Sequence, residues 1–345
     1  KVKKVRLGKS GLRVSEIILG CMSYGNKSWA GWVLEGDEAL QHMKHAWDQG
    51  INTFDTADAY SNGDSERLVG KFLKQYEIPR DEIVILTKLY FPVAKDPTSG
   101  RLMGEAGLDE SGFANQHGLS RKHIFDAIKG SLERMGVDYV DMVQCHRFDY
   151  NTPIEETMQA LHDIVQAGYV RYIGMSSCYA YQFHQMQNYA IQNKLTPFVS
   201  MQNYHNLAYR EEEREMVPTL GLFGAGMIPW SPLARGYLTR PVSEANDTLR
   251  SSTDPLFKKW GADEAVASIE INKRVEKIAK DKGRSMAQVA LAWSRSKPFV
   301  SAPIIGSTKM SNLDDLVAGL DLELTKEEVD YLEEPYQPCA IKGHL

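Results

Sequence analysis

The feature that most constrains the fold of this 345-residue chain is an alternation of strand-like and helix-like segments. Short apolar runs alternate with amphipathic stretches, and where no insertion intervenes the strand ends recur at near-constant spacing. Eight such βα units in one chain of this size predict a closed (β/α)8 TIM barrel. The expected strands cover residues 12–20, 51–55, 83–89, 139–146, 170–177, 198–204, 226–232 and 300–306.

Two insertions interrupt this alternation, after the third and the seventh strand. Residues 91–119 are rich in Gly and polar side chains, and residues 233–266 in Arg, Pro and Ser. We expect both to be long loops on the face where barrels carry their chemistry. Residues 3–14 begin before the first strand, overlap its start and predict a β-hairpin, a candidate lid or plug. Residues 1–345 are expected to form a single domain.

An open, doubly wound sheet is the main alternative to the barrel. It requires a phosphate-binding G-x-G-x-x-G after the first strand, where this chain has LGCMSYGN. The similar stretch GLFGAG at 221–226 lies between a helix and a strand, which is the wrong order for that motif. We interpret it as a helix end followed by a turn.

The composition limits the classes of molecule that this chain is expected to bind. Forty basic and 45 acidic residues give a formal net charge of −5, which provides no overall positive field for nucleic acid or an anionic membrane. The four cysteines lack any C-x-x-C spacing, and no apolar run approaches the roughly 20 residues that span a bilayer. We therefore expect a cytoplasmic protein with a small-molecule partner and no metal site. Oligomeric state stays open.

Four ionisable residues of complementary type stand near consecutive strand ends. Asp55, Lys88 and His146 end the second, third and fourth strands, and Tyr60 follows Asp55 by five residues. Individually, Asp55 would more often satisfy loop N–H groups, and His146 is as often a core residue as a site residue. Because the carboxyl ends of barrel strands share one rim, we expect all four side chains to meet there.

These residue types suit proton donation. A phenol has an ordinary pKa near 10, which a neighbouring ammonium lowers, and a carboxylate offsets the cost of burying that ammonium. Asp55, Lys88 and Tyr60 can form such a relay, while His146 can hydrogen-bond the oxygen that Tyr60 protonates. The set lacks a nucleophile, so the reaction that it suits is protonation of an alkoxide formed by hydride from elsewhere.

Seven motifs in order carry a resemblance to the aldo-keto reductase superfamily: FDTADAY, ILTKL, VQCH, IGMSS, SMQNYHN, PWSPLARG and PIIGSTKMSNLDDL. The similarity runs from the hairpin to about residue 320. It is strongest to fungal aryl-alcohol dehydrogenases and versiconal hemiacetal acetate reductases, and weaker to potassium-channel β-subunits. It implies reversible, NADPH-dependent reduction of an aldehyde or ketone. Tyr60 matches the general acid/base, with Asp55, Lys88 and His146 completing the family tetrad.

The same resemblance implies a cofactor site. Ser176 and Gln202 match residues that hold the nicotinamide carboxamide, and Trp230 matches the aromatic on which its ring stacks. The other matched cofactor residues are Gly20, Met22, Ser231, Leu233, Arg235, Gly236, Arg250, Gly306, Ser307, Thr308, Lys309, Asn312 and Asp315. Those from Ser231 to Gly236 match the loop around the pyrophosphate, and those from Gly306 to Lys309 match the pocket for the adenosine 2′-phosphate. Backbone N–H groups near a helix start suit such an anion in any family.

The chain departs from the family pattern at three positions. Ser177 stands where many relatives have Asn, Asn312 where Arg or Gln often binds the adenosine phosphate, and Leu316 where Asn often meets the adenine. Lys309, with Arg240 or Arg250, still supplies positive charge. NADPH is therefore expected in preference to NADH.

The predicted mouth loops also suggest a wide, aromatic substrate pocket. Its expected residues are Tyr24, Trp29, Trp32, Phe91, Arg147 and Phe148. Two other functions stay open at this point. One is a slow-turnover, cofactor-sensing accessory subunit like the channel β-subunits. The other is a metal-dependent barrel hydrolase with Asp55 and His146 as ligands, for which Ser176, Gln202 and Trp230 stand where further ligands would be needed.

Overall fold

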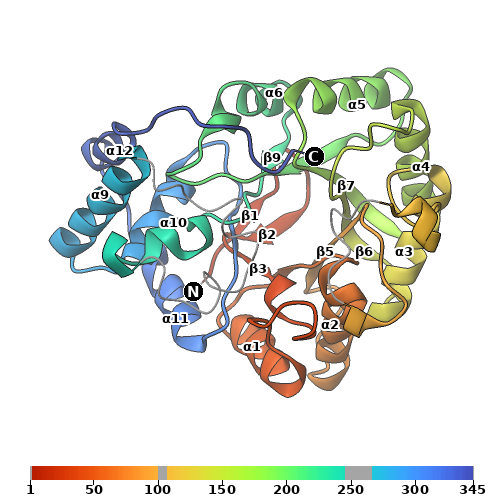
Figure 1. Cartoon of the computed structure of the whole chain (residues 1–345), viewed down its shortest axis with the longest axis horizontal. Coiled ribbons are helices and arrows are strands. Elements are labelled where there is room, and N and C mark those ends of the chain that lie inside the picture. The colour runs from red at the N-terminus through yellow and green to blue at the C-terminus, as the bar shows by residue number, and fades with distance from the viewer. Residues whose placement is uncertain (1, 100–106, 245–265, 345) are drawn as a thin grey trace.

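The computed structural model describes residues 2–99, 107–244 and 266–344. Its central element is an eight-stranded sheet in the order β10-β3-β4-β5-β6-β7-β8-β9, with every neighbouring pair parallel. The strands are β3 (Ile18–Gly20), β4 (Thr53–Asp55), β5 (Val84–Leu89), β6 (Val140–Cys145), β7 (Val170–Ser176), β8 (Phe198–Gln202), β9 (Gly226–Met227) and β10 (Ile304–Ile305). Figure 1 shows them surrounded by helices.

The sheet closes through backbone hydrogen bonds between β9 and the segment that leads into β10. The N–H of Ser301 donates to Met227 O at 2.8 Å, and the N–H of Ile304 donates to Pro229 O at 2.9 Å. Because β10 also pairs with β3, the strands form a ring. The predicted (β/α)8 barrel is confirmed.

Helices lie outside the ring and follow the strands along the chain (Figure 1). They are α1 (Gly36–Asp48), α2 (Asp64–Gln75), α3 (Arg121–Met135), α4 (Ile154–Gln166), α5 (Ala180–Gln192), α6 (Met216–Phe223), α9 (Val266–Lys282), α10 (Met286–Ser296), α11 (Met310–Ala318) and α12 (Lys326–Glu333). Local sequence sets their ends: for α3, Ser120 accepts the N–H of His123 as N-cap, and Gly136 ends the helix at φ 63°.

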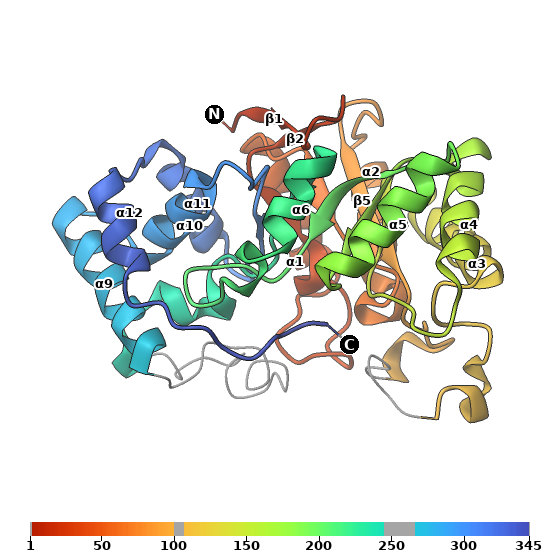
Figure 2. The ribbon, with the colours of Figure 1, turned by 90° about the horizontal axis from the view of Figure 1, so that it is seen from above.

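The predicted hairpin is present and plugs the barrel. Its strands, β1 (Lys4–Arg6) and β2 (Arg13–Ser15), are antiparallel. Leu7 and Val14 are fully buried in one apolar cluster with barrel residues such as Met142. Figure 2 shows the hairpin at one end of the molecule and the C-terminal segment crossing the opposite end. The end beyond the carboxyl termini of the strands is therefore the one left for chemistry.

One predicted strand, residues 12–20, is two strands in the structure. β2 belongs to the hairpin and β3 to the barrel, with a bend between them. The bend is held by side chains: the hydroxyl of Ser15 donates to Ile17 O at 2.7 Å, and Glu16 forms an ion pair with Arg295 at 2.6 Å. Hydrogen bonds from a serine side chain to the backbone compete with the backbone hydrogen bonds that join neighbouring strands.

The sequence EEEREMVPTL predicts one helix over residues 211–220, but the structure shows a later helix start. Residues Glu211–Glu213 form a short 3₁₀ turn, and α6 begins only at Met216. Pro218 is the reason, because proline lacks an N–H and fits only the first turn of a helix. A helix beginning at 211 would place Pro218 in its interior.

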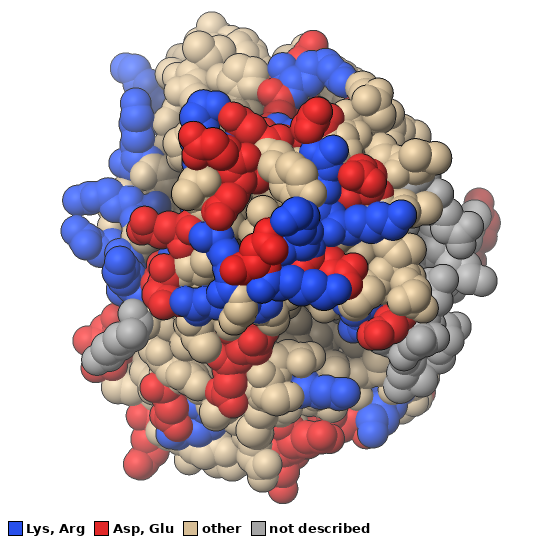
Figure 3. All heavy atoms as spheres, turned by 90° about the vertical axis from the view of Figure 1, so that its left-hand side faces the viewer, with Lys and Arg blue, Asp and Glu red and all other residues tan. Residues whose placement is uncertain are grey.

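Both insertions follow the third and seventh barrel strands as predicted, so far as residues 91–99, 107–119 and 233–244 describe them. On the face over α9 and α12, Figure 3 shows positive and negative side chains intermixed. Pairs such as Arg274–Glu334, at 2.7 Å, lie on these helices or next to them. Within the described ranges, no helix combines the length and the apolar character needed to cross a bilayer.

Candidate active site

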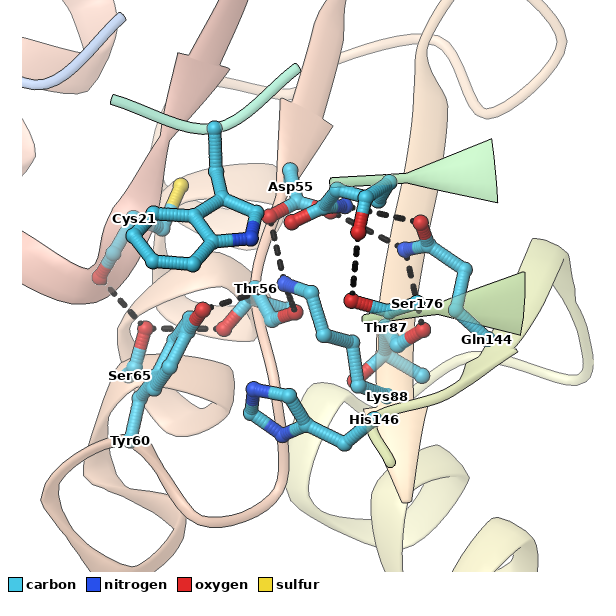
Figure 4. A network of polar contacts seen from close by, with 12 residues as sticks. Cys21, Asp55, Thr56, Tyr60, Ser65, Thr87, Lys88, Gln144, His146 and Ser176 are labelled. Carbon is cyan, nitrogen blue, oxygen red and sulfur yellow. Dashed lines mark hydrogen bonds and ion pairs between the residues drawn. The ribbon is translucent and has the colours of Figure 1, made fainter. Parts of the chain in front are cut away.

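The side chains of Asp55, Tyr60, Lys88 and His146 meet at the carboxyl end of the barrel strands (Figure 4). Asp55 ends β4, Lys88 lies near the end of β5, and His146 follows β6 directly. Tyr60 opens a short 3₁₀ turn beyond β4. All four residues are buried, with at most 7% of their surface exposed. The structure thus brings together the four side chains that the strand ends predicted to meet.

Lys88 is the centre of this group. Its Nζ donates to Asp55 Oδ2 at 2.6 Å, to Thr56 O at 3.0 Å and to Tyr60 Oη at 3.1 Å. An ammonium has three hydrogens, so these bonds use its whole donor capacity. Because Tyr60 Oη accepts one of them, the phenolic hydrogen is free to point elsewhere, and Tyr60 lines the cavity described below.

Burial dominates the electrostatics of the phenol. It raises the pKa of Tyr60 above its ordinary value, and the positive charge of Lys88 opposes only part of that rise. The net direction corrects the expectation of a lowered value. Burial alone would lower the pKa of Lys88, but Asp55 and Tyr60 raise it. At neutral pH the pair is thus a protonated phenol held by an ammonium.

His146 is held neutral. Burial lowers its pKa well below the ordinary value, and the charges of Arg147 and Lys88 add to that effect. Its ring meets Tyr60 edge-on at 5.8 Å between centroids. Among the described residues, Nδ1 has no hydrogen-bond partner. A neutral imidazole has one N–H to donate, which suits an oxygen acceptor near Tyr60.

Asp55 Oδ1 accepts hydrogen bonds from two side-chain amides. Nε2 of Gln144 and Nε2 of Gln202 each donate to it at 3.0 Å. Gln202 is a predicted site residue, whereas Gln144 was missed. Gln144 precedes His146 by two residues, and side chains two apart in a strand share a face, so the alternation in VQCH could have found it.

One large cavity of about 710 Å³ extends from this group along the barrel mouth. Fifteen of the predicted cofactor residues line it, and Arg250 lies outside the described residues. The fifteen are Gly20, Met22, Ser176, Gln202, Trp230, Ser231, Leu233, Arg235, Gly236, Gly306, Ser307, Thr308, Lys309, Asn312 and Asp315. Ser285, which was not predicted, also lines the cavity and donates to Asp315 at 2.5 Å.

The loop after β9 has an unusual backbone. Ser231, Ala234 and Arg235 have φ of 50°, 51° and 57°, and Gly236 has φ of 96°. A right-handed residue followed by a left-handed one, as at Leu233 (φ −99°) and Ala234, turns successive backbone N–H groups toward a common concavity, which is a geometry that binds anions. Arg235 lines the cavity beside them and is 8% exposed. This stretch therefore offers both N–H groups and a guanidinium.

Trp230 forms part of the cavity wall. One face of its indole stacks on Tyr204, with 4.5 Å between ring centroids, and its Nε1 donates to Ser177 Oγ at 3.3 Å. Ser177 is itself fixed, because its N–H donates to Asn203 Oδ1 at 3.1 Å. Ser177 thus orients Trp230.

The predicted substrate residues divide into two groups. Trp29, Trp32 and Arg147 line the cavity, and the ring of Trp29 lies 6.2 Å from that of Tyr60. The remaining three do not line it: Tyr24, Phe91 and Phe148. For these three the structure corrects the expectation.

Each correction has a physical reason. Tyr24 is fully buried, because its ring turns inward toward His42 of α1. Phe91 packs edge-on against His146 at 5.0 Å and supports that ring from behind. Phe148 packs beside Tyr150 at 5.1 Å and against the apolar core.

Comparison with known proteins gives the family. The model for the aldo/keto reductase family matches residues 16–337. This chain belongs to the aldo/keto reductase family. It is 50% identical to versiconal hemiacetal acetate reductase of Aspergillus parasiticus, over 97% of both chains. It is also 50% identical to a Schizosaccharomyces pombe protein named provisionally as an aryl-alcohol dehydrogenase, over 98% of this chain and 97% of that one.

An aldo-keto reductase of Fusarium vanettenii is 46% identical, over 98% of this chain and 92% of its own. Membership of the family makes this aldo/keto reductase an oxidoreductase. Asp55, which the hydrolase alternative requires as a metal ligand, is engaged with Lys88 and two amides instead. The part of the chain that the structure describes holds no group of three or more His, Cys, Asp or Glu arranged around a metal position.

Proposed function

We propose that this chain is an NADPH-dependent carbonyl reductase that reduces an aldehyde or ketone and, in reverse, oxidises the alcohol. The observation that carries the proposal is the hydrogen bond of Lys88 to Tyr60 Oη at 3.1 Å, at the wall of a cavity large enough for a cofactor and a substrate. Tyr60 is the proton donor in reduction and the base in oxidation.

The raised pKa of Tyr60 keeps the phenol protonated over the neutral range, so it can serve as an acid. Lys88 then stabilises the phenolate that forms when the proton leaves, because its ammonium already donates to that oxygen. Neutral His146 donates to the same substrate oxygen and orients it. Asp55 keeps the ammonium charged in a site where burial alone would favour its neutral form.

The residues that line the cavity fit NADPH. Arg235 and the left-handed loop around it would hold the pyrophosphate, and Lys309 with Ser307 would hold the 2′-phosphate. Ser307 Oγ donates to Lys309 O at 2.6 Å, which fixes this turn at the start of α11. Bound NADPH supplies the hydride. Arg240 also lines the cavity and adds positive charge, which favours NADPH over NADH.

Ser176, Gln202 and Trp230 would position the nicotinamide. Trp29, Trp32 and Arg147 would contact the substrate, and the aromatic pair suits a planar carbonyl compound. The names of the relatives, which refer to aryl alcohols and to a hemiacetal acetate, agree with such a substrate. We further propose one domain and a cytoplasmic location, which the four free cysteines support.

The test is NADPH oxidation followed at the nicotinamide absorbance, with aromatic and aliphatic aldehydes in parallel and NADH as the control. We expect turnover with NADPH for at least the aromatic aldehydes and a lower kcat/KM with NADH. Tight binding of NADPH without turnover of any carbonyl would favour the accessory-subunit alternative. A kcat/KM with NADH equal to that with NADPH would contradict the proposed pocket for the 2′-phosphate.

A further inference from the structure

Gln144 is a fully buried amide at the centre of the site whose role the tetrad does not explain. It lies in β6 with no exposed surface, and Figure 4 shows it beside Asp55 and Lys88. Its Nε2 donates to Asp55 Oδ1 at 3.0 Å and to Thr87 O at 3.4 Å, and its Oε1 accepts Nε2 of Gln202 at 2.7 Å.

The two amides and the carboxylate form a closed ring of hydrogen bonds. Gln202 Nε2 donates both to Gln144 and to Asp55 Oδ1, and Gln144 donates to the same carboxylate oxygen. Rotating either amide by half a turn would set a carbonyl oxygen against that carboxylate. The orientation of both amides is therefore fixed by Asp55, and Asp55 Oδ1 is fixed by them.

This ring of hydrogen bonds affects how the ammonium of Lys88 is shared between Asp55 and Tyr60. Asp55 Oδ2 takes one hydrogen of Lys88, while the amides satisfy Oδ1. If the amides were lost, the carboxylate would compete more strongly for the ammonium that also bonds Tyr60 Oη. The charge of Asp55 already opposes ionisation of the phenol, so a less satisfied carboxylate opposes it further.

We propose that Gln144 is a positioning residue for the proton transfer: its amide satisfies Asp55 Oδ1 and orients Gln202, and thereby keeps the ammonium of Lys88 directed at Tyr60 Oη. The inference rests on the proposed role of Tyr60 as the proton donor. It assigns no contact between Gln144 and a substrate, because Gln144 does not line the cavity within the described residues.

The experiment compares Gln144→Met, which keeps the volume and removes both polar groups, with Gln187→Met as the matched control. Gln187 is also a buried glutamine, 1% exposed, and its amide bonds the backbone of Phe198 on the outer side of β8. Gln144→Met removes three hydrogen bonds from a buried amide, and Gln187→Met removes two. Only Gln144→Met removes a hydrogen bond to Asp55.

The first readout is ionisation of the Tyr60 phenol in the protein without added cofactor. It is followed by NMR of ¹³Cζ-labelled tyrosine, with the Tyr60 signal assigned from Tyr60→Phe. We expect Gln144→Met to lower the phenolate fraction at a fixed alkaline pH by about threefold to tenfold, which is a midpoint shift of about 0.5–1 pH unit upward. Gln187→Met should leave the midpoint within about 0.2 unit, a shift far smaller than one lost hydrogen bond would cause.

The second readout is the pH profile of aldehyde reduction. Gln144→Met should lower kcat about tenfold while KM for the aldehyde changes less than about threefold, because the variant alters proton transfer and not substrate contacts. Gln144→Glu is measured as well, since it keeps the side-chain length if Gln144→Met folds poorly. Its second carboxyl group beside Asp55 should shift the phenol midpoint in the same direction.

A phenol midpoint that is unchanged in both Gln144 variants would overturn the proposal, as would an equal shift in Gln187→Met. Failure of the parent protein to reduce any aldehyde would instead contradict the proposed function. The two failures are distinguishable because the NMR titration needs neither cofactor nor substrate.

Discussion

Removing the positive charge at the centre of the site tests the energetics of the buried pair. Lys88 and Asp55 are 1% and 2% exposed, and their ion pair measures 2.6 Å. Lys88→Met keeps most of the side-chain volume but leaves a buried carboxylate. Breaking one partner of a buried pair costs about 3–5 kcal/mol. Because Gln144 and Gln202 still donate to Asp55, we expect the lower part of that range, about 3 kcal/mol.

That loss corresponds to a measurable shift in melting temperature. An unfolding entropy of about 2.1 cal/mol/K per residue over 345 residues gives roughly 0.7 kcal/mol per degree, so ~3 kcal/mol lowers Tm by about 4 °C. The assay is denaturant unfolding with calorimetry at pH 7. Asp55→Asn added to Lys88→Met should recover most of the loss, since the amide carries no charge. A double variant as unstable as Lys88→Met alone would refute the reasoning.

Three further predictions concern other parts of the molecule. Hydrogen bonds from Arg210 and His205 lower the pKa of Glu213 to about 2 although burial opposes this, so Glu213→Gln should cost about 2 kcal/mol at pH 7. Since the folded pKa is depressed, this difference should shrink as pH falls from about 4.5 toward 2 in urea unfolding, and a constant difference would contradict it. Gly70→Ala should destabilise by about 1–3 kcal/mol, because its Cβ would lie 2.6 Å from Met135 O; an unchanged denaturation midpoint would contradict this close approach of α2 and α3. Lys309→Met should raise KM for NADPH about tenfold and KM for NADH less than about twofold in the absorbance assay, and equal changes would contradict its role at the 2′-phosphate.

Much of the fold could be predicted because its signals are local. Strand ends at Asp55, Lys88 and His146 follow from short apolar runs, and a barrel brings such ends to one rim without any knowledge of loop conformation. The position of the bend within residues 12–20 could not be predicted, because beside the local bond of Ser15 it depends on Glu16 pairing with Arg295, which lies far along the chain. The start of α6 was predictable in principle, since Pro218 excludes the longer helix.

The residues that line the cavity were harder to predict from the sequence than the fold was. Asp55, Tyr60 and His146 line the cavity at strand ends or just beyond them, whereas Tyr24, Phe91 and Phe148 follow strands as closely and do not line it. Side-chain direction in a loop depends on tertiary packing, as with Tyr24 against α1, and sequence carries little information about it. The sign of the pKa shift at Tyr60 also needed coordinates, because it depends on how far burial exceeds the field of Lys88.

The central claim is that Tyr60 donates the proton, and Tyr60→Phe tests it most directly. The measurement is kcat for NADPH-dependent reduction of an aromatic aldehyde, together with Kd for NADPH from nicotinamide fluorescence. Tyr189→Phe on the outer helix α5 serves as the control. We expect kcat of Tyr60→Phe to fall by about 10³-fold or more while Kd changes less than about threefold. A kcat within tenfold of the parent protein would contradict the account.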